Sequence, residues 1–391
     1  MRHVYADNAG TTALSKTALD AMMPYLTDGY GNPSAIYSLG REAKKALEAS
    51  RAKIAAAIGA LPEEIYFTGS GTESDNWAIR GVAEAKSKKG KHIISSVIEH
   101  HAISHTLAYL EKQGFEITYL PVDTLGRISL DDLKEAIREE TILISVMTAN
   151  NEIGTIEPIE EIGKIAREKG VLFHTDAIQA VGHIAIDVKA MNIDLMSMAG
   201  HKFRGPKGVG ALYIKKGVAL PPLLFGGGQE RKKRSSTENV AGAVGMAAAL
   251  EEAAKNMSGN VERITAMRDR LIEELLKIPF SRLTGDPIRR LPGTASLVFE
   301  CVEGEAMVLT LDNAGICASS GSACSSASLD PSHVLLAIGL PHEIAHGSLR
   351  LSINETTSDA DIDYLLETIP PIITKLRAMS PLWEDKMNGK F

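Results

Sequence analysis

The sequence predicts an α/β fold: a mostly parallel, seven-stranded type of sheet covered by helices on both faces, joined to a smaller α+β domain. Three observations carry this prediction. Apolar strand-like runs alternate with amphipathic helical runs over roughly the first 250 residues, the strand-like runs are apolar throughout, and the alternation stops near residues 255–260. Strands that are apolar on both faces need cover on both faces, which is typical of parallel sheets.

Each expected strand in the first part of the chain is followed by an expected helix. The pairs are 64–69 with 72–86, 92–97 with 102–114, 115–122 with 129–140, and 141–149 with 157–170, while 171–177, 194–200 and 210–216 are further strands. The later part mixes long helical patterns, at 260–278 and 359–379, with apolar segments at 294–300, 304–315, 333–339 and 348–353. A chain of 391 residues exceeds one compact core. We therefore expect a large domain over 15–257 and a small domain formed by 1–14 and 258–391.

The composition is that of an ordinary globular protein, with 44% hydrophobic and 23% charged residues. A net charge of −7 argues against a general nucleic-acid-binding protein, and the basic run at 230–234 is interpreted as a solvated loop. No apolar run is long enough for a membrane helix, and the first residues do not have a signal-peptide pattern. The three cysteines, at 301, 317 and 324, are an odd and unevenly spaced set, so we expect no disulfide framework and a reducing, cytoplasmic setting.

Glycines and small hydroxyl residues fill the loop 68–76, between an expected strand and an expected helix. Backbone N–H groups and Thr72 could cradle a phosphate at the start of that helix. A turn with a helix cap is the alternative interpretation. No Walker lysine follows the loop, which excludes a nucleotide P-loop.

Three other loops follow expected strands, at the sheet edge where α/β proteins place their ligands. His100 ends a strand and could stack on a flat cofactor or move protons, or serve a structural role. Asn150 and Asn151 follow an apolar strand and could bond a ligand or make an Asx turn. Asp176 follows bulky apolar residues, where a carboxylate needs a cation or hydrogen-bond donors.

Lys202 follows the apolar strand at 194–200 and precedes a Gly-Pro-Lys-Gly turn. Near the carboxyl edge of a sheet a lysine is a candidate Schiff-base nucleophile, although a lone lysine is more often a surface residue. The combination carries the argument. A lysine for a Schiff base, an aspartate for a pyridinium nitrogen, a phosphate turn and an aromatic ring are together what pyridoxal phosphate needs.

Ten motifs extend the case over nearly the whole chain. They are ADNAGTT, GNPSAIYSLGREA, SGTESDN, IEHHA, ANNEIGTI, HTDAIQAVG, GHKFRGPKGVG, GGGQERKKRSSTEN, SSGSACSS and HGSLRLS. In their order and spacing they resemble the cysteine desulfurases of the NifS/IscS type, which are class V members of the fold-type-I pyridoxal-phosphate enzymes. The resemblance implies a dimeric enzyme that takes sulfur from L-cysteine.

The resemblance also implies a role for each cofactor-binding residue. Lys202 should form the Schiff base with the cofactor and then move the substrate's Cα proton. Asp176 should hold the pyridine nitrogen protonated, and His100 should stack on the ring. The remaining contacts fall to Gln179 and Asn151 at the phenolic oxygen, to Gly71, Thr72 and His201 at the phosphate, and to Thr237, which should reach the phosphate from the neighbouring subunit.

The substrate should be held and cleaved by three further residues. Arg350 and Asn32 should clamp the carboxylate of L-cysteine, a task that suits a guanidinium fork. Cys324, as a thiolate, should attack the substrate's sulfur and keep it as a persulfide. The loop 319–333 around Cys324 is made of small residues, which we interpret as giving the thiol reach, and we predict that this loop is poorly ordered or far from Lys202 at rest.

Two departures from the family pattern stand beside these matches. Ala199 replaces a serine that is usual three residues before the lysine, with Ser197 two residues earlier, so one phosphate hydrogen bond is missing or is supplied by a neighbour. The segment 354–357 replaces a Gly-Arg pair that often follows the strand of the substrate arginine. Neither departure removes a reactive group.

Other functions remain open at this stage. The run His-Glu-Ile-Ala-His at 342–346 matches the zinc-protease pattern, but Pro341 and Gly347 leave room for only one or two helical turns, and no third metal ligand is evident. An aminotransferase, a selenocysteine lyase or a cysteine-sulfinate lyase would use the same Lys202 and Asp176. A non-catalytic sulfur or iron-cluster carrier would not need them. The acceptor of the sulfur, whether an iron–sulfur scaffold or another carrier, is not encoded in any motif.

Overall fold

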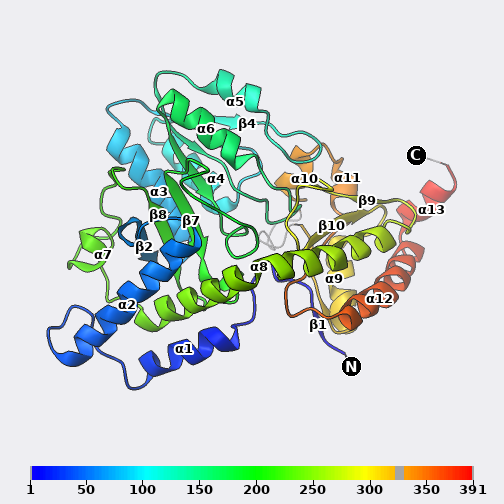
Figure 1. Cartoon of the computed structure of the whole chain (residues 1–391). Helices are drawn as coiled ribbons and strands as arrows, with labels where there is room; N and C mark the ends of the chain where they lie inside the picture. Colours follow the sequence, from blue (N-terminus) through cyan, green and yellow to red (C-terminus); the bar gives the residue numbers. More distant parts are fainter. Residues whose placement is uncertain (1, 322–329, 390–391) are drawn as a thin grey trace.

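A computed structural model describes residues 2–321 and 330–389, and its largest sheet has seven strands. Figure 1 shows this sheet in the larger part of the molecule. The strand order is β2-β8-β7-β6-β5-β3-β4. The strands are β2 (Ile65–Thr68), β3 (His92–Ser96), β4 (Glu116–Leu120), β5 (Thr141–Ser145), β6 (Leu172–Asp176), β7 (Leu195–Ala199) and β8 (Gly210–Ile214). Only the two pairings made by β8 are antiparallel within this sheet. The predicted mostly parallel sheet is therefore confirmed.

Helices cover both faces of this sheet, as the apolar strands require. On one face lie α1 (Lys16–Leu26), α2 (Ser38–Ala57), α5 (Leu130–Ala136), α6 (Ile159–Lys169) and the first part of α8 (Val240–Leu275). On the other lie α3 (Gly71–Lys86) and α4 (His101–Glu111). Neighbouring strand residues divide between the two cores: Ile94 and Ile144 face α2 and α6, while Ile93 and Leu143 face α3 and α4. This alternation explains why the strands are apolar at successive positions.

A smaller unit is built from the later part of the chain and the first few residues. It holds a three-stranded antiparallel sheet, β12-β10-β9, and a parallel pair, β1-β11. Its elements are β1 (Val4–Tyr5), β9 (Ser281–Leu283), β10 (Thr294–Phe299), α9 (Gly304–Asn313), β11 (Ile316–Cys317), α10 (His333–Ala337), α11 (His342–Ala345), β12 (Ser348–Ser352), α12 (Asp359–Ala378) and α13 (Pro381–Met387). The short turns η1 (Pro62–Glu64), η2 (Gly200–Lys202) and α7 (Gln229–Lys232) complete the described elements.

The helix α8 joins the two units. It begins at Val240, well before the helix expected over 260–278, and its residues contribute to the core on each side (Figure 1). Its first half packs against α1 and α2, which supports the helix at Gly242 and Gly245. The expected domain boundary between 257 and 258 falls inside this helix. The two-domain division itself stays our proposal.

A left-handed turn in the segment after β8 is pinned by a buried ion pair. Glu230, Arg231 and Lys232 have φ angles of 43°, 56° and 65°, a conformation that costs roughly 1–2 kcal/mol per residue. The Glu230 carboxylate accepts two hydrogen bonds from the guanidinium of Arg51, at 2.8 and 2.9 Å, and a third from the N–H of Phe67. These bonds hold in place the segment that leads to Thr237.

Breaking this pair should be costly, because it leaves a buried charge without its partner. We expect Glu230→Gln to lower the free energy of unfolding by about 3–5 kcal/mol. The matched control is Glu251→Gln, which breaks the exposed Lys53–Glu251 pair of 2.7 Å and should cost less than about 1 kcal/mol. Denaturant unfolding of both variants measures the difference. Equal losses would show that Arg51 and Glu230 do not support the turn.

Candidate active site

A cavity of about 410 Å³ opens where β5, β6 and β7 end, at the sheet edge that the motifs indicate. Nine of the residues singled out from the sequence line it: Gly71, Thr72, His100, Asn151, Asp176, Gln179, His201, Lys202 and Arg350. They come from segments that lie far apart in the sequence. The fold thus gathers most of the expected cofactor and substrate residues around one space.

Lys202 lies at the end of η2, directly after β7. Its Nζ donates hydrogen bonds to the backbone carbonyls of Ala9 and Gly10, at 2.5 and 2.8 Å. The side chain therefore points into the cavity against a turn near the start of the chain. Behind it, Nε2 of His183 donates to the backbone carbonyl of Lys202 at 2.9 Å.

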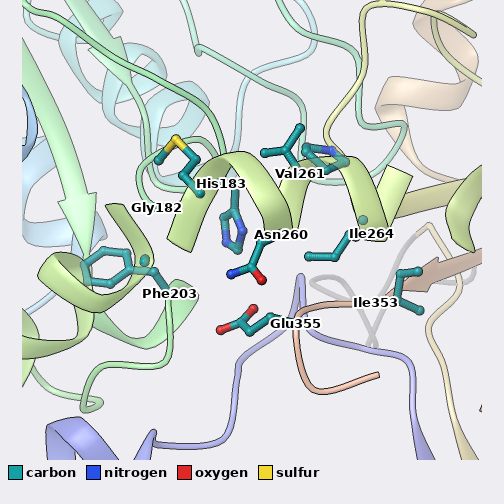
Figure 2. Close-up of a pocket in the computed structure, with 12 residues that line it drawn as sticks. Gly182, His183, Phe203, Asn260, Val261, Ile264, Ile353 and Glu355 are labelled. Carbon is teal, nitrogen blue, oxygen red and sulfur yellow. The ribbon is translucent and has the colours of Figure 1, made fainter. Parts of the chain in front are cut away.

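That histidine belongs to a second, much smaller pocket of about 30 Å³ beside α8 (Figure 2). His183, Asn260 and Glu355 line this pocket together with apolar side chains such as Phe203 and Ile264. None of the residues predicted for the site is among those that line it. His183 therefore connects this pocket to the backbone of Lys202. The pocket itself is separate from the 410 Å³ cavity.

Asp176 ends β6 and is buried at the floor of the cavity. Burial raises the pKa of its carboxyl to about 6, while a hydrogen bond from the N–H of Ile178, at 2.9 Å, and the charge of Lys202 act in the opposite direction. The sequence predicts that a carboxylate here needs a hydrogen-bond donor or a cation, and the N–H of Ile178 and the charge of Lys202 provide them. It is ionised at neutral pH.

A second carboxyl lies beneath Asp176. Asp75, on α3, is fully buried, and Nε2 of His174 lies 3.7 Å from its Oδ1. Burial, and then the charge of Asp176, raise the pKa of Asp75 well above its usual value. Two buried carboxyls that face each other cannot both ionise cheaply. The negative charge therefore resides on Asp176, which has Ile178 and Lys202 beside it, and Asp75 is the neutral acid.

His100 caps α4 and lines the cavity with its ring. Its Nδ1 accepts a hydrogen bond from the N–H of Ala102 at 3.1 Å, which places the ring proton on Nε2. Burial, and then the charge of Lys202, lower the pKa of His100 to about 4. The ring is neutral at physiological pH, as a group that stacks on an aromatic cofactor should be.

The loop 68–76 makes a helix N-terminus at the cavity wall. Ser70 caps α3 by accepting from the N–H of Glu73, so the helix-cap interpretation of this loop is confirmed. The first N–H groups of a helix have no partners within it, and they attract anions. A side chain at Gly71 would collide with Ile178, so the close packing of Ile178 against the start of α3 requires glycine here.

Asn150 and Asn151 have different positions: Asn150 makes hydrogen bonds within its own loop, and Asn151 lines the cavity. Asn150 makes the Asx turn, because its Oδ1 accepts from the N–H groups of Glu152 and Ile153, at 2.8 and 3.0 Å. Asn151 lines the cavity instead. Gln179, on the next loop, donates from Nε2 to the carbonyl of Ala9 at 2.9 Å.

Ala199 also lines the cavity, and Ser197 does not compensate for the missing serine hydroxyl. The Ser197 Oγ is bonded to Nε2 of His174 at 3.0 Å, in the polar layer beneath the cavity. His201 faces Thr11, with 3.1 Å between Nδ1 and Oγ1, and burial followed by the charge of Lys202 lowers its pKa to about 4. The hydroxyl-bearing residues that do line the cavity are Ser70 and Thr72.

Arg350, in β12, is only 4% exposed. Its Nη2 donates to Oδ1 of Asp7 at 2.7 Å, and its Nη1 donates to the carbonyl of Asn151 at 3.0 Å. The arginine is therefore a buried site residue rather than an exposed strand residue. Its partner, Asp7, was not predicted from the sequence.

Three predicted residues are not placed at the cavity. Asn32 is exposed and its Oδ1 accepts from the N–H of Ser34 at 2.9 Å. Thr237 is exposed, which fits a residue expected to act on a neighbouring subunit. Cys324, with the prediction about its loop, lies outside the described residues. Cys301 and Cys317 are free thiols.

Sequence reasoning missed the turn at Asp7–Gly10, which contacts Arg350, Lys202 and Gln179. The motif ADNAGTT contains this turn and was the available signal. It also missed Asp75, although that residue lies in the SGTESDN motif. Neither Asp7 nor Asp75 lies at the end of a strand. The rule that functional residues follow the strands of a parallel sheet therefore did not single them out.

The zinc-protease pattern at 342–346 finds little support in the described residues. The helix α11 has one turn, at His342–Ala345, and within 2–321 and 330–389 no three His, Cys, Asp or Glu side chains are grouped to hold a metal. In the same part of the chain no helix is long and apolar enough to cross a membrane.

Glu99, which precedes His100, is fully buried and holds a proton at neutral pH. Its Oε1 accepts from Ser96 Oγ and Met147 N, at 2.6 and 3.0 Å, and Oε2 has no hydrogen-bond partner among the described residues. Burial raises the pKa of Glu99 to about 8. At a pH between the pKa of Glu99 in the unfolded chain and its pKa of about 8 in the folded protein, the folded protein holds a proton that the unfolded chain has lost. The contribution of Glu99 to the free energy of unfolding therefore falls as the pH rises towards 8.

Replacing Glu99 should remove that dependence. We expect Glu99→Gln to lose less stability than the unaltered protein between pH 6 and pH 8, with a difference in slope of up to about 1.4 kcal/mol per pH unit. Denaturant unfolding at several pH values gives both slopes. Parallel slopes would mean that Glu99 is ionised in the folded protein.

Comparison with known proteins agrees with this fold. Residues 4–365 match the family described as aminotransferase class-V. The chain is 58% identical over 379 residues to a cysteine desulfurase IscS of Methanosarcina thermophila. The aligned residues cover 97% of this chain and 94% of the relative. Among solved structures, a NifS-like protein matches with a TM-score of 0.91 and 37% identity, over 96% of this chain and 100% of that one. A structure titled SspA in complex with cysteine matches with a TM-score of 0.79 and 38% identity, over 90% and 98%.

The chain therefore belongs to the class-V aminotransferase family, whose enzymes depend in general on pyridoxal phosphate. Within that family it falls among the cysteine desulfurases of the NifS/IscS type, the group that its motifs resemble. The sequence-based prediction of the family is confirmed.

Proposed function

We propose that the protein is a pyridoxal-phosphate-dependent cysteine desulfurase that releases L-alanine from L-cysteine and keeps the sulfur as a persulfide on Cys324. The observation that carries this proposal is the gathering of Lys202, Asp176 and the N-terminus of α3 around one cavity. Relatives that are 54–58% identical over nearly the whole chain bear the name cysteine desulfurase, which supports it.

The residues of the cavity fit each functional group of pyridoxal phosphate. The amine of Lys202 suits the aldehyde, and the Asp176 carboxylate suits the protonated ring nitrogen. Gly71 and Thr72, which line the cavity at the N-terminus of α3, suit the phosphate. His100 supplies a neutral ring for the flat face.

The other cavity residues complete this assignment. We assign Gln179 and Asn151 to the phenolic oxygen and His201 to the phosphate, since all three line the cavity. Arg350 and Asn32 are assigned to the substrate carboxylate, and of these Arg350 lines the cavity.

The chemistry divides between the cofactor and the chain. When bound, pyridoxal phosphate supplies an electron sink that stabilises negative charge at the substrate's Cα and makes the carbon–sulfur bond breakable. Lys202 takes the Cα proton and later returns a proton to carbon. Asp176 keeps the ring nitrogen protonated, and the neutral Asp75 beneath it leaves the negative charge on Asp176.

Sulfur transfer then needs a nucleophile. The thiolate of Cys324 attacks the sulfur of L-cysteine, so that a sulfur–sulfur bond forms as the carbon–sulfur bond breaks. The electron pair of the broken bond stays on carbon, which takes up a proton. L-cysteine and the Cys324 thiol thus give L-alanine and a Cys324 persulfide. A sulfur-acceptor protein, such as an iron–sulfur scaffold, is the proposed next carrier, in a reducing cytoplasm that suits the odd cysteine count.

Reconstitution of the protein with pyridoxal phosphate tests this function. We expect the cofactor's visible absorbance to appear on binding, and L-alanine and sulfide to form in equal amounts from L-cysteine when a thiol reductant discharges the persulfide. Transfer of the amino group to give a keto acid, without sulfide, would assign the chain to transamination instead. Turnover of selenocysteine but not of cysteine would indicate a selenocysteine lyase.

We also propose that two copies of the chain share their active sites through Thr237. An open pocket of about 610 Å³ adjoins the cavity, and Thr72 and His100 line both spaces. The rest of its wall comes from α3 and α4, including Arg80, His101 and Tyr109. A segment of a second copy that enters this pocket would bring Thr237 to the phosphate of its neighbour.

Mixed dimers separate a shared site from an independent one. If Thr237 acts across the interface, a dimer of one Lys202→Ala chain and one Thr237→Ala chain contains one intact site. Each pure variant should be slow, and an equal mixture after subunit exchange should recover up to about one quarter of the activity of the unaltered protein, because half of the dimers are mixed and each mixed dimer has one intact site of two. Mixing without any recovery would place Thr237 in its own chain's site or outside any site.

A further inference from the structure

The guanidinium of Arg350 is engaged by an acid of the same chain. Its Nη2 donates to Oδ1 of Asp7 at 2.7 Å, its Nη1 donates to the carbonyl of Asn151, and its Nε has no partner among the described residues. Asp7 itself lines the 410 Å³ cavity, with its side chain 28% exposed. An arginine assigned to a substrate carboxylate is thus already paired with a carboxylate.

The turn that carries Asp7 is shaped for this contact. The backbone carbonyl of Asp7 accepts from the N–H of Gly10 at 3.0 Å, and a side chain at Gly10 would lie 2.5 Å from Oδ2 of Asp7. Glycine at this position therefore makes room for the carboxylate. The same turn presents the carbonyls of Ala9 and Gly10 to Lys202.

The charge balance at Arg350 follows from these contacts. Asp7 neutralises most of the field that the guanidinium would otherwise present to the cavity, and the buried Glu152 is a further acid close to Arg350. A substrate carboxylate that binds this arginine has to share it with Asp7. Two carboxylates on one guanidinium repel each other, and an additional negative charge on the substrate meets the same repulsion.

We propose that Asp7 is a specificity-determining residue: its carboxylate weakens the hold of Arg350 on any amino-acid carboxylate and selects against amino acids that carry a second negative charge. This inference rests on the proposed function, in which Arg350 anchors the substrate. It gives the enzyme a physical reason to admit L-cysteine, whose side chain is neutral, while discriminating against aspartate and cysteine sulfinate.

The variant Asp7→Asn tests the charge alone, because asparagine keeps the shape and one acceptor for Arg350. Two inhibitors, L-aspartate and L-asparagine, differ in charge but hardly in shape. In the reconstituted enzyme we expect the KM for L-cysteine to fall about three- to fivefold with little change in kcat. We expect the ratio of the inhibition constants of L-aspartate and L-asparagine to fall by at least about threefold.

The control is Glu355→Gln, which removes an acid of similar exposure that pairs with Arg204 at 3.4 Å and lines the small pocket of Figure 2. It should leave the inhibitor ratio unchanged. Asp7→Ser removes the same charge with a smaller side chain and should move the ratio in the same direction, which covers a failure of Asp7→Asn to fold. Thermal unfolding of every variant verifies the fold.

An unchanged inhibitor ratio in the Asp7 variants overturns the proposal, whatever happens to KM. A raised KM together with an unchanged ratio would show that Asp7 only orients the guanidinium. Arg350→Lys separates this failure from a failure of the proposed function. If that variant keeps the KM for L-cysteine, Arg350 does not anchor the substrate, and both assignments fall.

Discussion

The Lys202→Ala protein should form L-alanine from L-cysteine about 10³-fold more slowly than the unaltered protein, or slower still. The amine of Lys202 is the group at the cavity that can both form a Schiff base and move the Cα proton, and an alanine can do neither. The loss should persist at saturating L-cysteine, because the missing step follows binding. Rates of alanine formation in single-turnover conditions measure it.

Lys215→Ala is the matched control for this experiment. Lys215 follows the antiparallel strand β8 and therefore lies at the opposite edge of the sheet, where its Nζ pairs with Asp194 at 2.7 Å. The Lys215→Ala variant loses the same charge as Lys202→Ala, and its rate of L-alanine formation should stay within a few-fold of that of the unaltered protein. Sulfide release from Lys202→Ala equal to that of the unaltered protein would overturn the mechanism.

Replacing Asp176 should have the second largest effect. Asparagine fills the same space and still accepts from Ile178, but it carries no charge to stabilise a protonated pyridine nitrogen. We expect Asp176→Asn to slow alanine formation by about 10²- to 10⁴-fold and to alter the visible absorbance of the bound cofactor. The absorbance reports on the ring nitrogen directly, which a purely structural loss would not change.

Asp194→Asn provides the comparison. Asp194 precedes β7 at the far edge of the sheet and accepts from the N–H of Phe173 at 3.1 Å, so its loss affects stability rather than the cavity. Full activity in Asp176→Asn, with an unchanged spectrum, would remove Asp176 from the cofactor site. A loss of equal size in both variants would point to folding rather than to chemistry.

The sequence was sufficient for the sheet and for the residues at its strand ends. Lys202, Asp176 and His100 each follow an apolar strand, and strand ends of a parallel sheet meet at one edge, so their approach could be inferred from order alone. The helix α8 shows where local patterns fall short. We expected its helix to begin at residue 260, whereas the helix begins at Val240, and its first half packs on α1 and α2.

The partners of the site residues were harder to predict. Asp7 accepts a hydrogen bond from Arg350, which lies 343 positions away in the chain. Asp75, on α3, interacts electrostatically with Asp176, at the end of β6. No periodic pattern encodes such long-range contacts between single side chains. The same limit applies to Ser197, whose position near Ala199 suggested a phosphate ligand but whose hydroxyl is bonded to His174.

Mass spectrometry of the protein after exposure to L-cysteine tests the central claim most directly. We predict a sulfur adduct on the peptide that contains Cys324, its absence in Cys324→Ala, and its absence in Lys202→Ala, where sulfur cannot be released. An adduct on Cys301 or Cys317 that survives in Cys324→Ala would contradict the account and reassign the nucleophile.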